Sequence, residues 1–288
     1  MKNTMMTFTQ KLQRSVRSSN SVLSVGLDPD PIKIPQPLKA QFPDKEELVF
    51  EFCRRIIEAT KTEAAAYKPN LAFFEALGPG GWRVLDALMD LIPAAKVTIA
   101  DAKRGDIGTT AEKYKEAFFD ELHADSVTLN PLMGFDTLEP YFYDESKAVF
   151  VLTITSNKGS ADLLRLPVMG RASVGEYIAE HLAAAQNKSA THLGMVVGAT
   201  QPDSARQVLK VNPNAHLLMP GIGAQGGDLN LIEELLKDHR GIPIINSSRS
   251  IIYAGGDMEN WEELVQKKAA ETRVSLMEIT KKYLTHQE

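Results

Sequence analysis

The chain has 288 residues, of which 43% are hydrophobic and 24% charged, a composition typical of soluble globular proteins. Its 32 basic and 37 acidic side chains give a net charge of −5, which argues against nucleic-acid or anionic-membrane binding. No apolar run is long enough to span a membrane. The chain has a single cysteine, Cys53, so a disulfide within the chain is excluded. This predicts a reducing, cytoplasmic location.

Short β-rich runs alternate with helix-like segments along the whole chain. Many of the runs are apolar throughout, which is typical of parallel strands buried on both faces. We expect strands at 21–28, 64–70, 96–103, 126–131, 148–156, 192–200, 216–223 and 242–249. We expect helices at 44–61, 79–91, 108–122, 171–187, 202–211 and 228–238. This alternation predicts a (β/α)8 TIM barrel over about 20–255, with a doubly wound parallel sheet as the alternative.

Three segments exceed a minimal barrel. A proline-rich loop, 34–44, follows the first strand, and a long loop, 157–170, follows the fifth. Loops at these strand ends often cover the active site, although surface insertions are the alternative. A charged amphipathic helix at about 257–286 is expected to pack outside the barrel. We also expect an additional helix before the first strand. The barrel and these added segments are predicted to form a single domain over 1–288.

The active site of such a barrel lies at the carboxyl ends of its strands. Polar and charged side chains stand at the ends of several predicted strands. They are Asp28, Lys68, Asp101, Lys103, Ser156 and Arg249. Carboxylates, ammonium groups and a guanidinium are therefore expected to face one mouth of the barrel.

The densest group of charges is DAKRGDIGTT, residues 101–110. Because side chains alternate along a strand, Asp101 and Lys103 should point the same way and Arg104 away from them. Asp106 lies beyond the strand. Charges this dense at a buried strand end are costly unless they are paired. The motif predicts a protonated Lys103 held near carboxylates, and a self-satisfied salt-bridge network is the alternative.

The turn GIGAQGG, 221–227, contains G-x-G-x-x-G between a strand and a helix, so a dinucleotide site is one interpretation. The acidic residue expected about twenty positions later is missing. The favoured interpretation is a phosphate cradle of backbone N–H groups around Gly226, Gly227 and Ser248, with Arg249 as a bidentate ligand.

Metal ligation is not predicted. The 6 histidines are scattered without H-x-H or H-E-x-x-H spacing, and we expect them at surface or helix-end positions.

Taken together, the motifs resemble those of the orotidine 5′-phosphate decarboxylases, in particular the longer-chain bacterial members. The similarity rests on DAKRGDIGTTAEKY together with GLD, YKPN, TSNKG, PGIGAQGGD and SSRSIIYA, in the family's order. It implies decarboxylation of orotidine 5′-phosphate to uridine 5′-phosphate and CO₂ without a cofactor, as the last step of UMP biosynthesis. The implied catalytic residues are Lys68, Asp101, Lys103 and Asp106, with Lys103 protonating C6.

The resemblance also implies a set of substrate contacts. They are Asp28, Thr110, Ser156, Pro220, Gln225, Gly226, Gly227, Ser248 and Arg249. Asp28 and Lys68 would contact the ribose hydroxyls, Ser156 the pyrimidine, and the residues from Pro220 onwards the phosphate end. Asp106 and Thr110 would come from the neighbouring subunit, which implies a homodimer. After Ser156 the chain departs from the family pattern, so no further contact is assigned in that loop.

Two other functions remain alternatives. A Mg²⁺-dependent hexulose-phosphate synthase or keto-gulonate-phosphate decarboxylase shares Asp-x-Lys-x-x-Asp but needs an additional acidic ligand on the second strand. That strand ends with Lys68, and Glu63 stands at its opposite end. A non-catalytic phosphometabolite-binding barrel would need the cradle but not the four charged residues together.

Overall fold

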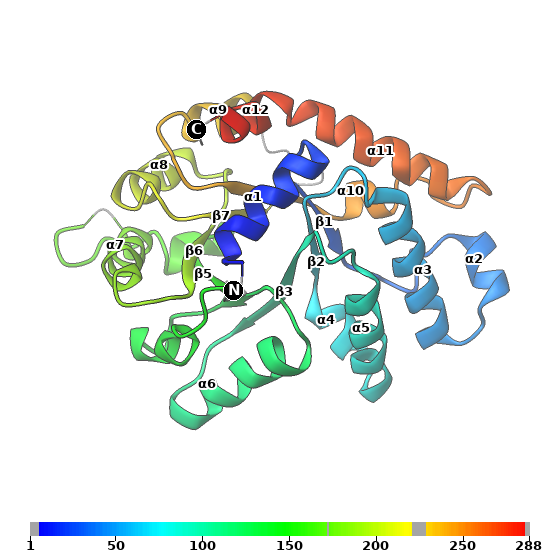
Figure 1. Ribbon diagram of the computed structural model, residues 1–288, viewed down its shortest axis with the longest axis horizontal. Coiled ribbons are helices and arrows are strands. Elements are labelled where there is room, and N and C mark those ends of the chain that lie inside the picture. The colour runs from blue at the N-terminus through cyan, green and yellow to red at the C-terminus, as the bar shows by residue number, and fades with distance from the viewer. Residues whose placement is uncertain (1–5, 172, 221–228, 286–288) are drawn as a thin grey trace, which may run out of the picture.

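The computed structural model describes residues 6–171, 173–220 and 229–285. Its centre is a closed barrel of parallel strands in the order β1 to β8, which confirms the predicted (β/α)8 fold over the doubly wound alternative (Figure 1). Closure is completed by pairing of the first strand with the last. The strands are β1 Leu23–Leu27, β2 Ala66–Pro69, β3 Val97–Arg104, β4 Ser126–Leu129, β5 Ala148–Ile154, β6 His192–Val197, β7 Leu217–Pro220 and β8 Pro243–Ser247.

Helices surround the barrel (Figure 1). They are α2 Gln36–Gln41, α3 Lys45–Thr60, α4 Leu71–Glu75, α5 Pro79–Leu91, α6 Gly108–Lys115, α7 Val174–Gln186, α8 Pro202–Val211, α9 Leu229–Leu235 and α10 Arg249–Ile252. Shorter helical turns are η1 Glu116–Glu121, η2 Phe135–Tyr141 and η3 Lys158–Asp162. The helix predicted over 108–122 is thus divided into α6 and the π-helical η1. None of the helices in the described part of the chain is long and apolar enough to cross a membrane.

The apolar runs form buried strands because both of their faces are covered. In β5, Val149, Phe150 and Val151 are fully buried between the barrel interior and the outer helices. Burial on both faces removes the alternation of polar and apolar residues seen in half-exposed strands. Because the barrel interior and the outer helices cover the strands along their length, polar side chains can gather only at the ends of the strands.

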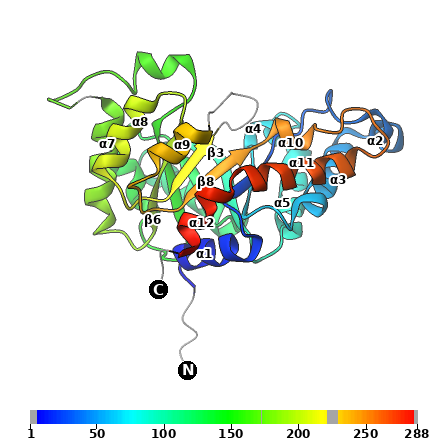
Figure 2. The same ribbon diagram turned by 90° about the horizontal axis from the view of Figure 1, so that it is seen from above.

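A helix preceding the barrel, α1 Phe8–Ser19, covers its amino-terminal end (Figure 2). Its start is fixed by a capping box, in which the Thr7 side chain accepts from the Gln10 backbone and the Gln10 side chain accepts from that of Thr7. The side chains of Phe8, Leu12 and Val16, on one face of α1, are buried. This end of the barrel is therefore closed, and the opposite end remains available for a site.

Two of the histidines, His192 and His216, pack under α1, contrary to the surface or helix-end positions expected for them, whereas His123 is exposed as expected. The His192 and His216 rings stack with centroids 4.0 Å apart. The His216 backbone N–H donates to His192 Nε2 at 2.9 Å, and the Ile242 N–H donates to His216 Nδ1 at 3.0 Å. Burial lowers the pKa of His192 to about 4, which keeps it neutral. These rings are internal hydrogen-bond acceptors for backbone at the starts of strands.

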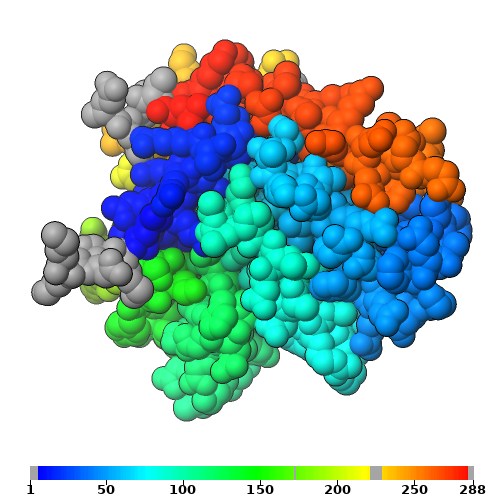
Figure 3. Space-filling model, turned by 45° about the vertical axis from the view of Figure 1, so that its right-hand side comes forward, coloured from blue at the N-terminus to red at the C-terminus, as the bar shows by residue number. Residues whose placement is uncertain are grey.

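The C-terminal segment forms two helices, α11 Trp261–Ser275 and α12 Met277–Thr285, where one helix was predicted. The chain turns at Leu276, whose side chain is fully buried. Trp261 packs α11 against Phe52 of α3 at a ring distance of 5.6 Å. In Figure 3 these helices (orange to red) and α1 (blue) cover neighbouring parts of the surface. Helices outside the barrel are therefore present at both ends of the chain, as predicted: α1 before the first strand, and α11 and α12 after the last.

Candidate active site

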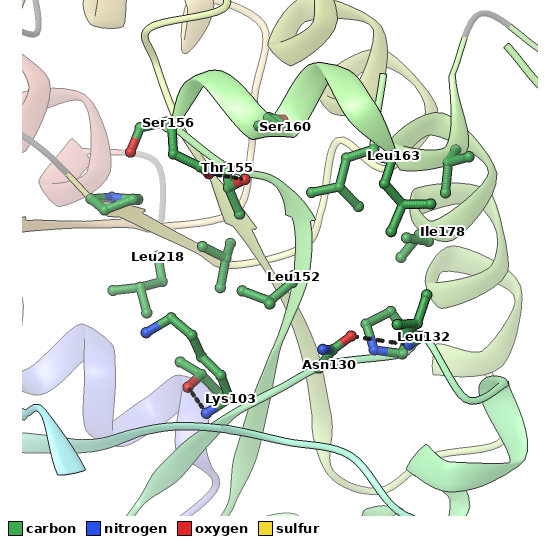
Figure 4. A pocket seen from close by; sticks show the side chains of 18 of the residues that line it. Lys103, Asn130, Leu132, Leu152, Thr155, Ser156, Ser160, Leu163, Ile178 and Leu218 are labelled. Carbon is green, nitrogen blue, oxygen red and sulfur yellow. Dashed lines mark hydrogen bonds between the residues drawn. The ribbon is translucent and has the colours of Figure 1, made fainter. Parts of the chain in front are cut away.

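A cavity of about 700 Å³ lies at the carboxyl-terminal ends of the strands. Figure 4 shows Lys103 on one side of it and Thr155 and Ser156 on the other, with Leu152 and Leu218 between them. One side of the cavity is therefore charged and the adjoining wall apolar. This arrangement suits a ligand that has both a polar edge and an uncharged ring.

The charged side is an array centred on Asp101. Lys68 from β2 donates to Asp101 Oδ2 at 2.5 Å, and Lys103 from β3 donates to Asp101 Oδ1. Lys68 and Asp101 are only 5% and 8% exposed, whereas the Lys103 side chain is 50% exposed. Two ammonium groups thus share one buried carboxylate, and only the Lys103 ammonium reaches well into the open space.

Both buried members of the array are charged near neutral pH. Burial alone would raise the pKa of Asp101, but the ammonium groups of Lys68 and Lys103 outweigh it and lower that pKa. Burial alone would lower the pKa of Lys68, but Asp101 and Asp28 outweigh it and raise that pKa. The carboxylate can therefore act as a fixed negative charge beside the cavity.

The backbone brings Asp101 and Lys103 together in a different way from the one predicted. Regular alternation is interrupted, because the pairing of β3 with β4 shifts register between Ala100 and Arg104. Lys103 has φ of 49°, in the left-handed region that non-glycine residues seldom occupy. Arg104 points away as expected, forming an ion pair with Glu75. The predicted proximity of Asp101 and Lys103 is confirmed, but a distorted strand produces it.

Asp106 and Thr110 lie apart from the array within one subunit. Neither lines the cavity, and the Asp106 carboxylate accepts from the N–H of its neighbour Ile107 at 2.8 Å. Gly105 makes this departure possible, because a Cβ there would lie 2.3 Å from the Asn130 carbonyl oxygen. The chain after Lys103 consequently turns outward, and Thr110 is exposed in the first turn of α6.

At the first strand, Asp28 stands next to the array. Its Oδ1 is buried without a hydrogen-bond partner among the described residues. A buried acceptor without a partner is costly, so the atom is suited to receive a donor from a ligand. The simple salt-bridge alternative explains the Lys68–Asp101 pair but accounts neither for this Asp28 oxygen nor for the exposure of Lys103.

The predicted residues of the later strands are only partly brought together. Ser156 after β5 and Pro220 at the end of β7 line the cavity. Ser248 and Arg249 begin α10 after β8 but do not line it. Arg249 is exposed, and no carboxylate in the described part of the chain pairs with it. Of the predicted phosphate cradle, Gln225, Gly226 and Gly227 lie outside the described residues.

The contribution of β4 to the cavity was not predicted. Thr128 and Asn130 both line the cavity, and Thr128 is bonded to the array. The expectation of polar residues at strand ends would have found Asn130, which directly follows β4. Thr128 gave no comparable signal, since a threonine inside a strand is ordinary.

The two predicted loops differ in their relation to the cavity. Gly159, Ser160 and Leu163 of 157–170 line it, so this segment covers the site. The 34–44 segment contains α2, and none of its residues is among those lining the cavity. Among the described residues, no three His, Cys, Asp or Glu side chains are grouped so that they could hold a metal ion.

Comparisons with known proteins agree on the family. The model of the orotidine 5′-phosphate decarboxylase / HUMPS family matches residues 21–264. An orotidine 5′-phosphate decarboxylase from Dehalococcoides mccartyi is 41% identical over 257 residues, covering 88% of this chain and 92% of the relative. One from Herpetosiphon aurantiacus is 43% identical over 249 residues, covering 86% and 90%.

Solved structures show the same relationship. The putative orotidine-monophosphate decarboxylase of Toxoplasma gondii has a TM-score of 0.83 at 32% identity, covering 98% of this chain and 99% of that one. The OMP decarboxylase of Leishmania donovani has a TM-score of 0.77 at 34% identity, covering 96% and 99%. The chain belongs to the orotidine 5′-phosphate decarboxylase / HUMPS family.

Proposed function

We propose that this protein decarboxylates orotidine 5′-phosphate to uridine 5′-phosphate and CO₂, with Lys103 as the proton donor. The family and the named relatives support this reaction and a place in pyrimidine biosynthesis. The observation that carries the residue assignment is the Lys68–Asp101–Lys103 array, whose outer ammonium faces the cavity.

The chemical difficulty is the carbanion left at C6 when CO₂ departs, because its electron pair cannot spread into the ring. A fixed ammonium close to C6 stabilises that charge as it develops and then delivers its proton to the same carbon. Asp101 supplies the fixed negative charge that keeps Lys103 in place. Beside the substrate carboxylate, this charge disfavours the bound substrate relative to the transition state, in which the carboxylate is becoming neutral CO₂.

The substrate contacts assigned are those that the family motifs imply, and Lys68, Ser156 and Pro220 among them line the cavity. Asp28 and Lys68 would bind the ribose hydroxyls, and the unpartnered Asp28 Oδ1 supports this assignment. Ser156 would bind the pyrimidine from the wall opposite Lys103. Pro220 would lie toward the phosphate end, where Ser248 and Arg249 would bind the anion together with Gln225, Gly226 and Gly227.

We also propose that the working unit is a homodimer. Asp106 and Thr110 are turned away from the array of their own subunit, and the apolar side chain between them in sequence, Ile107, is 55% exposed. A second copy placed against this surface would receive Asp106 and Thr110 at its own site.

A cytoplasmic location is also proposed. The chain has a single cysteine, Cys53, and so cannot form a disulfide within itself, which is the usual state of proteins in a reducing compartment.

The proposed reaction can be tested directly by ultraviolet absorbance. Adding orotidine 5′-phosphate to the protein in EDTA should cause the orotate-type absorbance to disappear as uridine 5′-phosphate forms. The family description also includes the HUMPS enzymes, so the chelator separates the Mg²⁺-dependent alternative from the proposed one. Unchanged absorbance would refute the proposal, and Mg²⁺-dependent turnover of a hexulose phosphate in its place would favour the alternative.

Replacing Arg249 by alanine should lower kcat/KM for orotidine 5′-phosphate about ten- to hundredfold. The loss corresponds to one charge-assisted hydrogen-bonding group, about 1.5–3 kcal/mol. Binding energy from the remote phosphate helps to hold the ring against the array, so kcat should fall as well as KM rise. Steady-state kinetics with orotidine, which lacks the phosphate, provide the control, because the variant and the parent should then be equal. A near-normal kcat/KM for the phosphorylated substrate would refute the phosphate assignment.

A further inference from the structure

Thr128 of β4 connects the two residues at the centre of the site. Its side chain is buried, with 1% exposure. The Thr128 hydroxyl accepts from the Lys103 backbone N–H at 2.9 Å and lies 3.1 Å from Asp101 Oδ1, to which it donates. One hydroxyl therefore touches both the carboxylate of the array and the backbone that carries its outer lysine.

The first of these bonds replaces a missing one in the sheet. The β3–β4 register shifts between Ala100 and Arg104, so the Lys103 N–H has a side-chain acceptor where a regular strand would offer a carbonyl. Lys103 also has φ of 49°, which costs free energy for a residue with a Cβ. The Thr128 hydroxyl holds this strained residue in place, and regular pairing resumes where the Asn130 N–H donates to the Arg104 carbonyl at 2.7 Å.

The second bond fixes the direction of the carboxylate. A hydroxyl has a single proton, and its oxygen is already an acceptor for the Lys103 N–H. The proton is therefore directed at Asp101 Oδ1, the same oxygen that receives the Lys103 ammonium. The other oxygen, Oδ2, is held by Lys68. With both oxygens engaged, the Asp101 carboxylate cannot rotate without breaking a bond to a neighbouring strand.

We infer that Thr128 is a positioning residue of the decarboxylation, which fixes the Asp101 carboxylate and the Lys103 backbone so that the Lys103 ammonium is aimed at the reacting carbon. This inference rests on the proposed function. Its physical basis is that preorganised charges stabilise a transition state only when they do not have to reorient during the reaction. The hydroxyl acts through Asp101 and Lys103 and serves neither as acid nor as base.

The test compares Thr128→Val, which keeps the shape but loses the hydroxyl, with Thr128→Ser, which keeps the hydroxyl. Thr128→Val should lower kcat by about tenfold or more while KM changes less than about threefold, because the lost alignment affects the transition state and spares ground-state binding. Thr128→Ser should recover kcat to within about threefold of the parent. A role confined to packing would give the opposite order, since valine fills the space better than serine.

Thr98 provides a matched control at the other end of the barrel. Its hydroxyl accepts from the Asp125 N–H at 2.9 Å and donates to Asp125 Oδ2 at 3.0 Å. These are the same two kinds of contact, with a backbone N–H and a carboxylate, but both are made to one residue and neither residue lines the cavity. Thr98→Val should lower the unfolding temperature but leave kcat unchanged. Equal kcat values for Thr128→Val and Thr98→Val would overturn the inference, as would failure of serine to recover activity.

An inactive parent protein would refute the proposed function itself, so the two failures are distinguishable. If Thr128→Val does not fold, Thr128→Ala replaces it with Thr98→Ala as its control. The inference then requires kcat to fall about tenfold or more in Thr128→Ala alone, with KM nearly unchanged, and equal kcat values for the two alanine variants would overturn it.

Discussion

Replacing Lys103 by alanine should reduce decarboxylation by about ten-thousandfold or more, to below detection, while leaving the fold intact. General acid catalysis contributes about 10²–10⁴ in rate, and electrostatic stabilisation of the developing charge adds about 10²–10³. One ammonium supplies both effects here. Its side chain is 50% exposed, so its removal leaves no cavity in the core, and Lys68 and Thr128 still pair with Asp101.

The Lys103→Ala variant should be measured by ultraviolet assay at high enzyme concentration and by thermal unfolding. Lys61→Ala is a suitable control, because Lys61 has 44% side-chain exposure and also pairs with a carboxylate, that of Glu58 at 2.5 Å. The control should retain normal turnover. Residual activity of Lys103→Ala within about tenfold of the parent would rule out Lys103 as the proton donor, given the size of the effects assigned to it.

Mixing two inactive variants should restore turnover if Asp106 serves the neighbouring site. Asp106→Ala and Lys103→Ala should each be inactive as homodimers. In a hybrid dimer, one site combines an intact Lys103 with an intact Asp106 from the other subunit, and the second site lacks both. Random exchange of equal amounts should therefore recover about one quarter of the parental sites.

The hybrid experiment needs proof that subunits exchange, which native mass spectrometry of differently tagged chains provides. Each variant mixed with a tagged copy of itself should stay inactive. If hybrids form and no activity returns, Asp106 does not act across the interface. Activity of the Asp106→Ala homodimer close to that of the parent would exclude any catalytic part for this carboxylate.

The sequence by itself determined the barrel and the content of the charged array. Apolar runs such as 148–154 have no stable place except between two covering layers, so eight of them alternating with helices indicate a closed parallel sheet. The active site of that fold lies at one end of the strands, which is why Lys68 and Asp101 could be grouped although they are 33 positions apart. Local pattern and fold-level rules were sufficient for these features.

Only the tertiary structure decided how the array is held. The register shift in β3 and the left-handed backbone at Lys103 depend on a contact with Thr128 of another strand, and no local pattern encodes a contact between strands. The burial of His192 and His216 was missed for the same reason, since the register of β6 and β7 brings them together under α1. The sequence is sufficient to say which side chains stand at the end of each strand. The direction in which each side chain points depends on residues of other strands, which become its neighbours only when the barrel closes.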